Sequence, residues 1–386
     1  MKHLSLKIMS LSIFLGLAAC LPQEQVKDPA SSGMVQGEAA PASDTVTADG
    51  KAESADSVSD GGAPMPSSSA PSSSAPSSTG ASKPAGGGVG NQIASLTAGL
   101  FSDALNIDSF LNFLQAKGGD LQYPANAALR KDLSRDQWLA LVPAKVTSPA
   151  SKLEIALVLD VTGSMGDELS YLQREWTTII SDLKVLYPSV NFRLSLIAYR
   201  DLSDNFVTSI TDFTVDQTAF QAELGKYQAA GGGDYPEAVD RAFADANKLS
   251  WGDATSTKLL FWVADAPPHS QDEAATLNEI LSLKSKGVTI YPVAASGVAD
   301  RAELIMRIGA LVSGGSYLFL TDDSGIGNSH AEPHIPCYQV ERLNQLLLRV
   351  LAEKITGQAS PAKPENILRT VGQSKDGVCQ IPQPAQ

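Results

Sequence analysis

Apolar residues from position 153 onward fall into short segments of two alternating kinds. The segment 153–160 (LEIALVLD) is almost continuously apolar, as expected of a strand that is covered on both faces. The segment 168–187 repeats its apolar residues at helical spacing. Strands are predicted at 153–160, 191–201, 206–213, 258–265, 288–295 and 316–321, and helices at 168–187, 216–228, 237–249, 273–287, 300–313 and 340–355. This alternation predicts an α/β fold, a doubly wound, mostly parallel sheet with helices on both faces.

The stretch 93–151 that precedes this pattern carries a weaker signal. Apolar residues in 105–114 have helical spacing and predict a helix that closes at Gly118, whereas 138–142 (WLALV) reads as a strand. Because about 58 residues are few for an independent core, we expect a small lead-in subdomain that packs on the main domain.

The N-terminus has the pattern of a secretory leader. Lys2 and Lys7 precede the apolar stretch 8–19, which is too short to span a bilayer. The residues 17–20 (LAAC) resemble the lipobox of bacterial lipoproteins, which implies cleavage of a signal peptide at 1–19 and lipidation of Cys20. Several acyl chains on one residue would anchor the protein to a membrane. In this resemblance a leucine after the cysteine, in place of an aspartate, implies the outer membrane of the bacterial cell envelope.

A tether is expected between the lipid anchor and the folded part. Residues 21–92 contain no Phe, Trp or Tyr, so they cannot bury enough apolar surface to fold, and we expect them to be disordered. The predicted plan is a signal peptide at 1–19, the lipidated cysteine and tether at 20–92, the lead-in at 93–151, the main domain at 152–322, and a C-terminal loop, helix and tail at 323–386.

Charge narrows the classes of partner. The formal net charge is −13, and loss of the leader removes Lys2 and Lys7 and no acid, which lowers it to −15. Such a chain repels phosphate backbones, so we expect no nucleic-acid partner, whereas divalent cations are compatible with it. In an exported chain Cys337 and Cys379 are expected to form a disulfide, and two free buried thiols are the alternative.

Oxygen-bearing side chains follow the predicted strands. The first strand ends in 160–166 (DVTGSMG), another ends in Asp265, and the loop 231–237 (GGGDYPE) carries Asp234 ahead of a helix. Because ligands of such sheets bind at the carboxyl ends of the strands, these oxygens predict one site for Mg²⁺, or for Mn²⁺ or Ca²⁺. The i, i+2, i+4 spacing of Asp160, Thr162 and Ser164 allows the three side chains to converge.

Four motifs in this order resemble those of von Willebrand factor A domains: DVTGSMG at 160–166, YRD at 199–201, GGGDYPE at 231–237 and DAPPH at 265–269. The resemblance covers about 153–321. It implies a metal-ion-dependent adhesion site formed by Asp160, Thr162, Ser164 and Asp265, and a protein partner whose acidic side chain completes the coordination of the cation.

One position departs from the family pattern. Many members have a threonine in the second loop, and Asp234 stands nearest to it here. A third carboxylate would hold a dication more tightly and would leave it less electrophilic toward an acidic partner. We therefore expect a metal-dependent binding module at the cell envelope, not an enzyme; a structural envelope protein with a stabilising cation and a metal-assisted hydrolase are the alternatives.

Several residues keep a second interpretation. Asp160 and Ser164 could cap the following helix. Asp201 could accept a hydrogen bond behind the ligands or only form a turn, and His269 could bond near the metal or only stabilise its loop. The segment 330–337 (HAEPHIPC) has spacing that suggests zinc, but no second ligand pair accompanies it.

Two further classes of site are disfavoured by local sequence. The glycines at 231–233 follow a predicted helix and lack the Lys-Ser/Thr of a phosphate loop, so no nucleotide is expected. Residues 162–166 (TGSMG) do not form the G-x-S-x-G nucleophile motif of hydrolases.

Overall fold

A computed structural model describes residues 95–125, 127–326 and 328–380. The predicted leader, Cys20 and the tether lie outside these residues. Within the described ranges, no helix has both the length and the apolar character needed to cross a bilayer.

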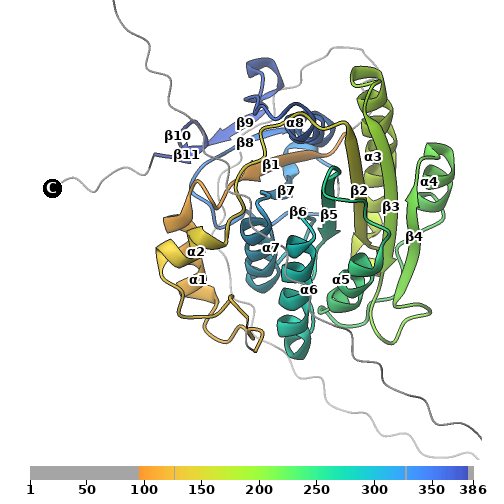
Figure 1. The fold of residues 1–386 in the computed structure, drawn as a ribbon. Helices are drawn as coiled ribbons and strands as arrows, with labels where there is room; N and C mark the ends of the chain where they lie inside the picture. Colours follow the sequence, from red (N-terminus) through yellow and green to blue (C-terminus); the bar gives the residue numbers. More distant parts are fainter. Residues whose placement is uncertain (1–94, 126, 327, 381–386) are drawn as a thin grey trace, which may run out of the picture. The chain divides into compact units, whose positions relative to one another are not determined.

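Nine of the described strands form one sheet in the order β4-β3-β2-β5-β6-β7-β1-β8-β9 (Figure 1). The strands β3, β2, β5, β6 and β7 run parallel, while β4 and β1 pair antiparallel with their neighbours and β9 pairs antiparallel with β8. The bounds are β1 Thr97–Phe101, β2 Lys152–Asp160, β3 Asn191–Tyr199, β4 Thr208–Thr214, β5 Thr257–Ala264, β6 Val288–Ala294, β7 Tyr317–Thr321, β8 Tyr338–Arg342 and β9 Arg369–Val371. The predicted mostly parallel α/β sheet is confirmed.

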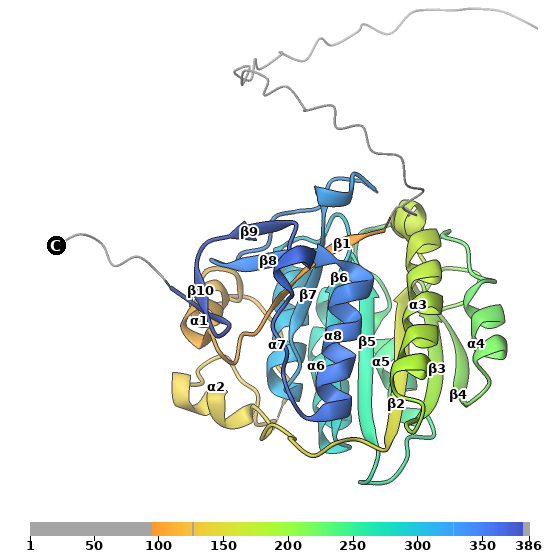
Figure 2. The ribbon, with the colours of Figure 1, turned by 90° about the horizontal axis from the view of Figure 1, so that it is seen from above.

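Helices cover both faces of the sheet (Figure 2). The apolar residues of α3 Gly166–Leu186, α4 Gln217–Leu224 and α8 Leu343–Thr356 pack on one face, and those of α5 Val239–Lys248, α6 Glu273–Ser285 and α7 Asp300–Ser313 pack on the other. Successive residues of β5 show the two layers directly. The ring of Phe261 contacts Trp176 of α3, while the ring of Trp262 contacts Phe243 of α5, because side chains alternate between the faces of a strand.

The lead-in contributes to the main sheet. β1 lies between β7 and β8, and α1 Ile107–Lys117 packs beside α7. A buried ion-pair cluster joins the lead-in to α7. The guanidinium of Arg307 in α7 bonds Asp103 of the lead-in at 2.7 Å and Glu303 of the same helix at 3.0 Å. The bounds of the separate subdomain stay a prediction, but its first strand belongs to the main sheet.

The strand predicted at 138–142 was wrong. These residues belong largely to α2 Arg135–Leu141, a helix that begins with a capping box. The Ser134 hydroxyl accepts a hydrogen bond from the Gln137 amide, and the Gln137 side chain accepts one from the Ser134 amide. This reciprocal pair specifies a helix start and outweighs the strand propensity of the apolar residues.

The C-terminal helix begins later than predicted. Residues Tyr338–Arg342 form β8, and α8 starts only at Leu343. Pairing with both β1 and β9 explains the difference, because the alternate residues Tyr338 and Val340 are buried in the sheet. The predicted disulfide between Cys337 and Cys379 is confirmed, with Cα atoms 5.5 Å apart. It fixes the short hairpin of β10 Ser374–Lys375 and β11 Val378–Cys379 to the start of β8.

The register of the sheet places the carboxyl ends of three strands together. β2 pairs in parallel with β3 on one side, where Asp160 lies opposite Tyr199, and with β5 on the other, where Leu159 lies opposite Val263. The loops that follow β2, β3 and β5 therefore emerge at the same edge, and this edge is where the candidate residues gather.

Candidate metal centre

The first loop holds a buried carboxylate in a fixed orientation. Asp160 ends β2 and is fully buried. Its Oδ1 accepts hydrogen bonds from the Thr162 amide at 2.9 Å and from the Thr162 hydroxyl at 2.7 Å. The hydroxyl proton of Thr162 is used in its bond to Asp160. The Ser164 hydroxyl, 3.2 Å from the Thr162 hydroxyl, is therefore the donor of the bond between these two groups. Asp160, Thr162 and Ser164 are thus joined by a chain of hydrogen bonds.

The glycine loop closes over the first loop through backbone hydrogen bonds. The Ala230 amide donates to the Val161 carbonyl, and the Gly163 amide donates to the Gly231 carbonyl, both at 3.1 Å. Gly231 and Gly232 have φ of 79° and 75°, a conformation that side chains rarely tolerate. Asp204 fixes the same loop, since its Oδ2 accepts a hydrogen bond from the Gly232 amide at 2.8 Å. These contacts explain why glycines occupy this segment.

The acid that this loop buries is Glu237. Asp234, the second-loop ligand predicted from the sequence, is exposed to solvent, and its role stays a prediction. Glu237 is only 3% exposed. Its amide donates to the Pro267 carbonyl at 3.0 Å, which fixes it beside the loop of Asp265. A methyl group built on Gly232 would meet both Glu237 Oε1 at 2.9 Å and Thr162 Cβ at 3.3 Å, so the Glu237 carboxylate faces the first loop.

Asp265 brings a second aspartate to the same place. It follows β5 and is 4% exposed. The Tyr235 hydroxyl donates to the Asp265 carbonyl at 2.9 Å and accepts from the Ala299 amide at 2.8 Å, which fixes the loop from two sides. Burial and then the charge of Asp265 raise the pKa of Asp160 to about 7. Two aspartates therefore share a site that favours a positive charge.

Asp201 and His269 form a partly buried pair beside these residues. The Nε2 of His269 lies 2.7 Å from Asp201 Oδ1, and Asp201 is 5% exposed. The pair joins the loop after β3 to the loop after β5. Both residues thus have hydrogen-bonding roles beside the site, which agrees with the interpretation of Asp201 as an acceptor behind the ligands.

The donor set fits a hard divalent cation. Within the part of the chain that the structure describes, Asp160 Oδ2 and Glu237 Oε2 are buried and have no hydrogen-bond partner. A buried carboxylate oxygen without a partner is costly, and a cation would remove that cost. Ser164 is exposed, so the site opens to solvent. Among the same described residues, no three His, Cys, Asp or Glu side chains could hold an ion on their own, so the hydroxyls of Thr162 and Ser164 are needed as well.

The zinc alternative at 330–337 is excluded by its partners. Cys337 is bonded to Cys379. The two imidazoles pair with carboxylates of different helices: His330 with Glu168 of α3 at 2.8 Å, and His334 with Glu303 of α7 at 2.9 Å. The histidines therefore attach this loop to two helices.

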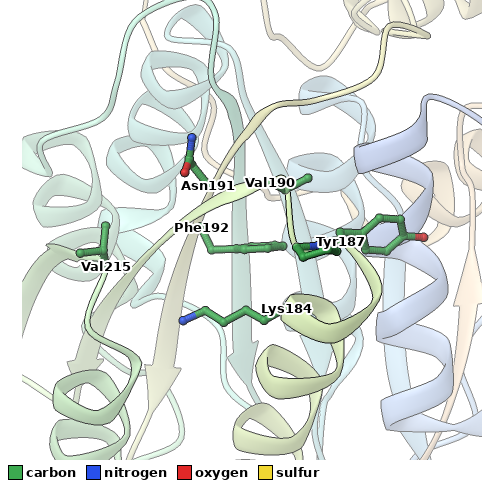
Figure 3. A pocket seen from close by; sticks show the side chains of 7 residues that line it. Lys184, Tyr187, Val190, Asn191, Phe192 and Val215 are labelled. Atoms are coloured by element: carbon green, nitrogen blue, oxygen red, sulfur yellow. The ribbon is translucent and has the colours of Figure 1, made fainter.

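A separate cavity of about 310 Å³ lies between the end of α3 and the start of β3 (Figure 3). Lys184, Phe192 and Val215 are among its lining residues. Because α3 begins at the acidic edge and runs to the opposite one, this cavity lies at the amino ends of the parallel strands. It contributes no residue to the candidate site.

Similar solved structures include three bacterial proteins. BatB from Bacteroides thetaiotaomicron has a TM-score of 0.37 at 11% identity, covering 53% of this chain and 98% of its own. The pilus adhesin SpaC from Lactobacillus rhamnosus GG has a TM-score of 0.35 at 12% identity, covering 48% of this chain and 29% of its own. A von Willebrand factor type A protein from Catenulispora acidiphila has a TM-score of 0.32 at 15% identity, covering 40% of this chain and 37% of its own.

Each of two curated relatives matches less than half of the chain. An ariadne-like RING finger protein of Acanthamoeba polyphaga mimivirus is 26% identical over 186 residues, which are 44% of this chain and 18% of that protein. Hemicentin-2 of Mus musculus is 31% identical over 150 residues, which are 38% of this chain and 3% of that protein. This chain therefore spans less than a fifth of the length of either relative.

The match to a family model agrees with the position of the site. Residues 154–304 match the model described as von Willebrand factor A domain. This range runs from β2 into α7, and it includes every loop of the candidate site. On the strength of this match, of the sheet order and of the four motifs, the chain contains a von Willebrand factor A domain.

Proposed function

We propose that this domain is a cation-dependent protein-binding module carried by a lipid-anchored protein of the bacterial envelope. The observation that supports it most strongly is the first loop. Asp160 is held rigidly through Oδ1 while its buried Oδ2 has no hydrogen-bond partner among the described residues, and the line of hydroxyls from Thr162 ends at the exposed Ser164. A site that binds a partner through a cation needs both features, namely a buried ligand in a fixed position and a second ligand that is accessible from solvent.

Four residues would hold Mg²⁺, or Mn²⁺ or Ca²⁺: Asp160, Thr162, Ser164 and Asp265. Carboxylate and hydroxyl oxygens are the ligands that such hard cations prefer. When bound, the ion would supply a positive centre at the open end of the site, where an oxygen of a protein partner could complete the coordination. The family resemblance implies an acidic side chain of the partner in that role.

The lipid anchor rests on the sequence of the leader and on Cys20. It can be tested by metabolic labelling with a fatty acid, which should label the wild type and fail to label Cys20→Ala. Fractionation of the envelope would then show whether the protein resides in the outer membrane.

Binding is tested by capture of envelope proteins on the purified chain in Mg²⁺ and in chelator, with Asp160→Asn as the matched control. We expect partners that the wild type retains in Mg²⁺ and releases in chelator, and that Asp160→Asn does not retain in either buffer. Equal capture in all conditions would contradict the proposal. A cation that raises thermal stability without changing capture would indicate a structural role, and a turnover abolished by Asp160→Asn would indicate an enzyme.

A further inference from the structure

Glu237 is a buried acid that the metal-site motifs do not account for. It lies between Pro236 and the start of α5, and two backbone contacts fix its position. Its amide donates to the Pro267 carbonyl, and it forms an isolated parallel bridge with Pro268, three residues after Asp265. Its backbone is therefore attached to the third loop of the site.

The side chain of Glu237 is directed toward the first loop. Gly232 stands between Glu237 and Thr162, and a methyl group at Gly232 would overlap Glu237 Oε1. Glu237 is 3% exposed, and its buried Oε2 has no hydrogen-bond partner among the residues that the structure describes. The absence of a side chain at Gly232 thus leaves space for the Glu237 carboxylate, although the described residues give its Oε2 no hydrogen bond.

The electrostatic surroundings of Glu237 are acidic. The carboxylates of four aspartates act on Glu237: Asp160, Asp201, Asp265 and Asp204. Each of these neighbours disfavours the ionised form of Glu237. A carboxylate retained among four aspartates is expected where a cation is bound nearby.

We propose that Glu237, not Asp234, is the third carboxylate that acts on the cation site, as a supporting group beside the ligands Asp160, Thr162, Ser164 and Asp265. The inference rests on the proposed function, and it deepens it by assigning the second-loop position. The sequence predicts that Asp234 causes tighter binding of the cation and a weaker electrophilicity of the bound cation. Both effects are due to Glu237 instead. Asp234 is exposed on the outer side of the loop and contributes little to binding of the ion.

The test compares two variants of the full chain that each replace one carboxyl group of the same loop with an amide. Titration with Mn²⁺, followed by calorimetry, should show that Glu237→Gln weakens binding about 10- to 100-fold, the range found when supporting groups of metal sites are removed. Asp234→Asn should stay within about 2-fold of the wild type. Wild-type affinity in Glu237→Gln, or a larger loss in Asp234→Asn, would overturn the assignment.

Thermal unfolding separates loss of the site from loss of the fold. In chelator, Glu237→Gln should unfold at or above the wild-type temperature, because an uncharged amide replaces a buried acid; in Mn²⁺ it should show a smaller upward shift than the wild type. Glu237→Asp, which keeps a carboxyl group, should recover part of that shift. A Glu237→Gln variant that is less stable in chelator and has an unchanged shift in Mn²⁺ would overturn the proposal.

The outcome for Asp160→Asn distinguishes this inference from the proposed function. If Asp160→Asn abolishes uptake of Mn²⁺ while Glu237→Gln leaves it unchanged, the cation site stands and the role of Glu237 falls. If the wild type itself takes up no Mn²⁺, both fall.

Discussion

At the scale of single residues, the site depends on a glycine that leaves space for two other side chains. Gly232 has φ of 75°, and a methyl group there would press on Glu237 and Thr162. We expect Gly232→Ala to lower the free energy of unfolding by about 1 to 3 kcal/mol and to weaken binding of Mn²⁺. Urea denaturation and a cation titration measure both effects.

Gly233 provides the matched control for this prediction. It lies next in the chain, and a methyl group there would meet no atom within 4 Å. We expect Gly233→Ala to change stability by less than about 0.5 kcal/mol. Equal losses in the two variants would show that the loop is sensitive to any alanine, and that the space beside Gly232 is not the cause.

The residues of the first and third loops could be predicted from the sequence, whereas the acid of the second loop could not. Asp160, Thr162 and Ser164 lie two apart, and a local spacing specifies their contacts. Asp234 and Glu237 both lie in one loop, and only the tertiary hydrogen bond from Glu237 to Pro267 determines which of them turns inward. The one local clue is that Glu237 directly precedes the apolar pair Ala238 and Val239.

At the scale of elements, the loop after β7 is attached to the start of α3 by a histidine. The side chain of His330 is 3% exposed and lies 2.8 Å from both Glu168 and Asp322. Burial by itself lowers the pKa of His330, but the hydrogen bonds to Glu168 and Asp322 outweigh it, so the pKa is raised. Protonated His330 therefore stabilises the folded state.

This shift predicts a pH dependence of stability. A histidine whose folded pKa exceeds its unfolded value stabilises most below about pH 6.5, and the contribution disappears as the pH rises through the folded value. The difference in unfolding free energy between the wild type and His330→Gln should thus be larger at about pH 5.5 than at about pH 8.5. Urea denaturation at each pH measures it, and an equal difference at both would contradict this account.

A second prediction concerns the attachment of the lead-in to α7. Arg307 is fully buried between Asp103 and Glu303. Arg307→Met should cost about 3 to 5 kcal/mol, because two buried carboxylates lose their counter-charge. Arg130→Ala, which breaks the exposed pair with Asp132, should cost less than about 1 kcal/mol. Similar losses in the two variants would argue against the buried cluster as the anchor of the lead-in.

The elements of the central sheet were predictable because their apolar patterns are long and continuous. The helix predicted at 300–313 coincides with α7, and the strand predicted at 153–160 differs from β2 by one residue. The strands β1 and β8 were missed because each has only five residues, too few for a pattern that stands out from its surroundings. Their strand conformation follows from pairing with partners that are distant in the sequence, which local pattern does not encode.

At the scale of the whole described fold, the central sheet is extended beyond β7 by β1, β8 and β9, and a disulfide secures this extension. Cys337 and Cys379 are separated by 42 residues. Replacing both by serine should lower the free energy of unfolding by about 4 kcal/mol, since the unfolded chain regains the entropy of an open loop. Denaturation with and without a reductant measures the effect, and a reductant that does not destabilise the wild type would contradict it.

The central claim is that loops from three separate parts of the chain converge on one cation at the carboxyl edge of the sheet. Calorimetric titration of Mg²⁺ into the purified full-length chain, beside Asp160→Asn, tests it most directly. The account predicts a single saturable binding event in the wild type and none in the variant. A folded wild type that takes up neither Mg²⁺, Mn²⁺ nor Ca²⁺, or a variant that binds as well as the wild type, would contradict it.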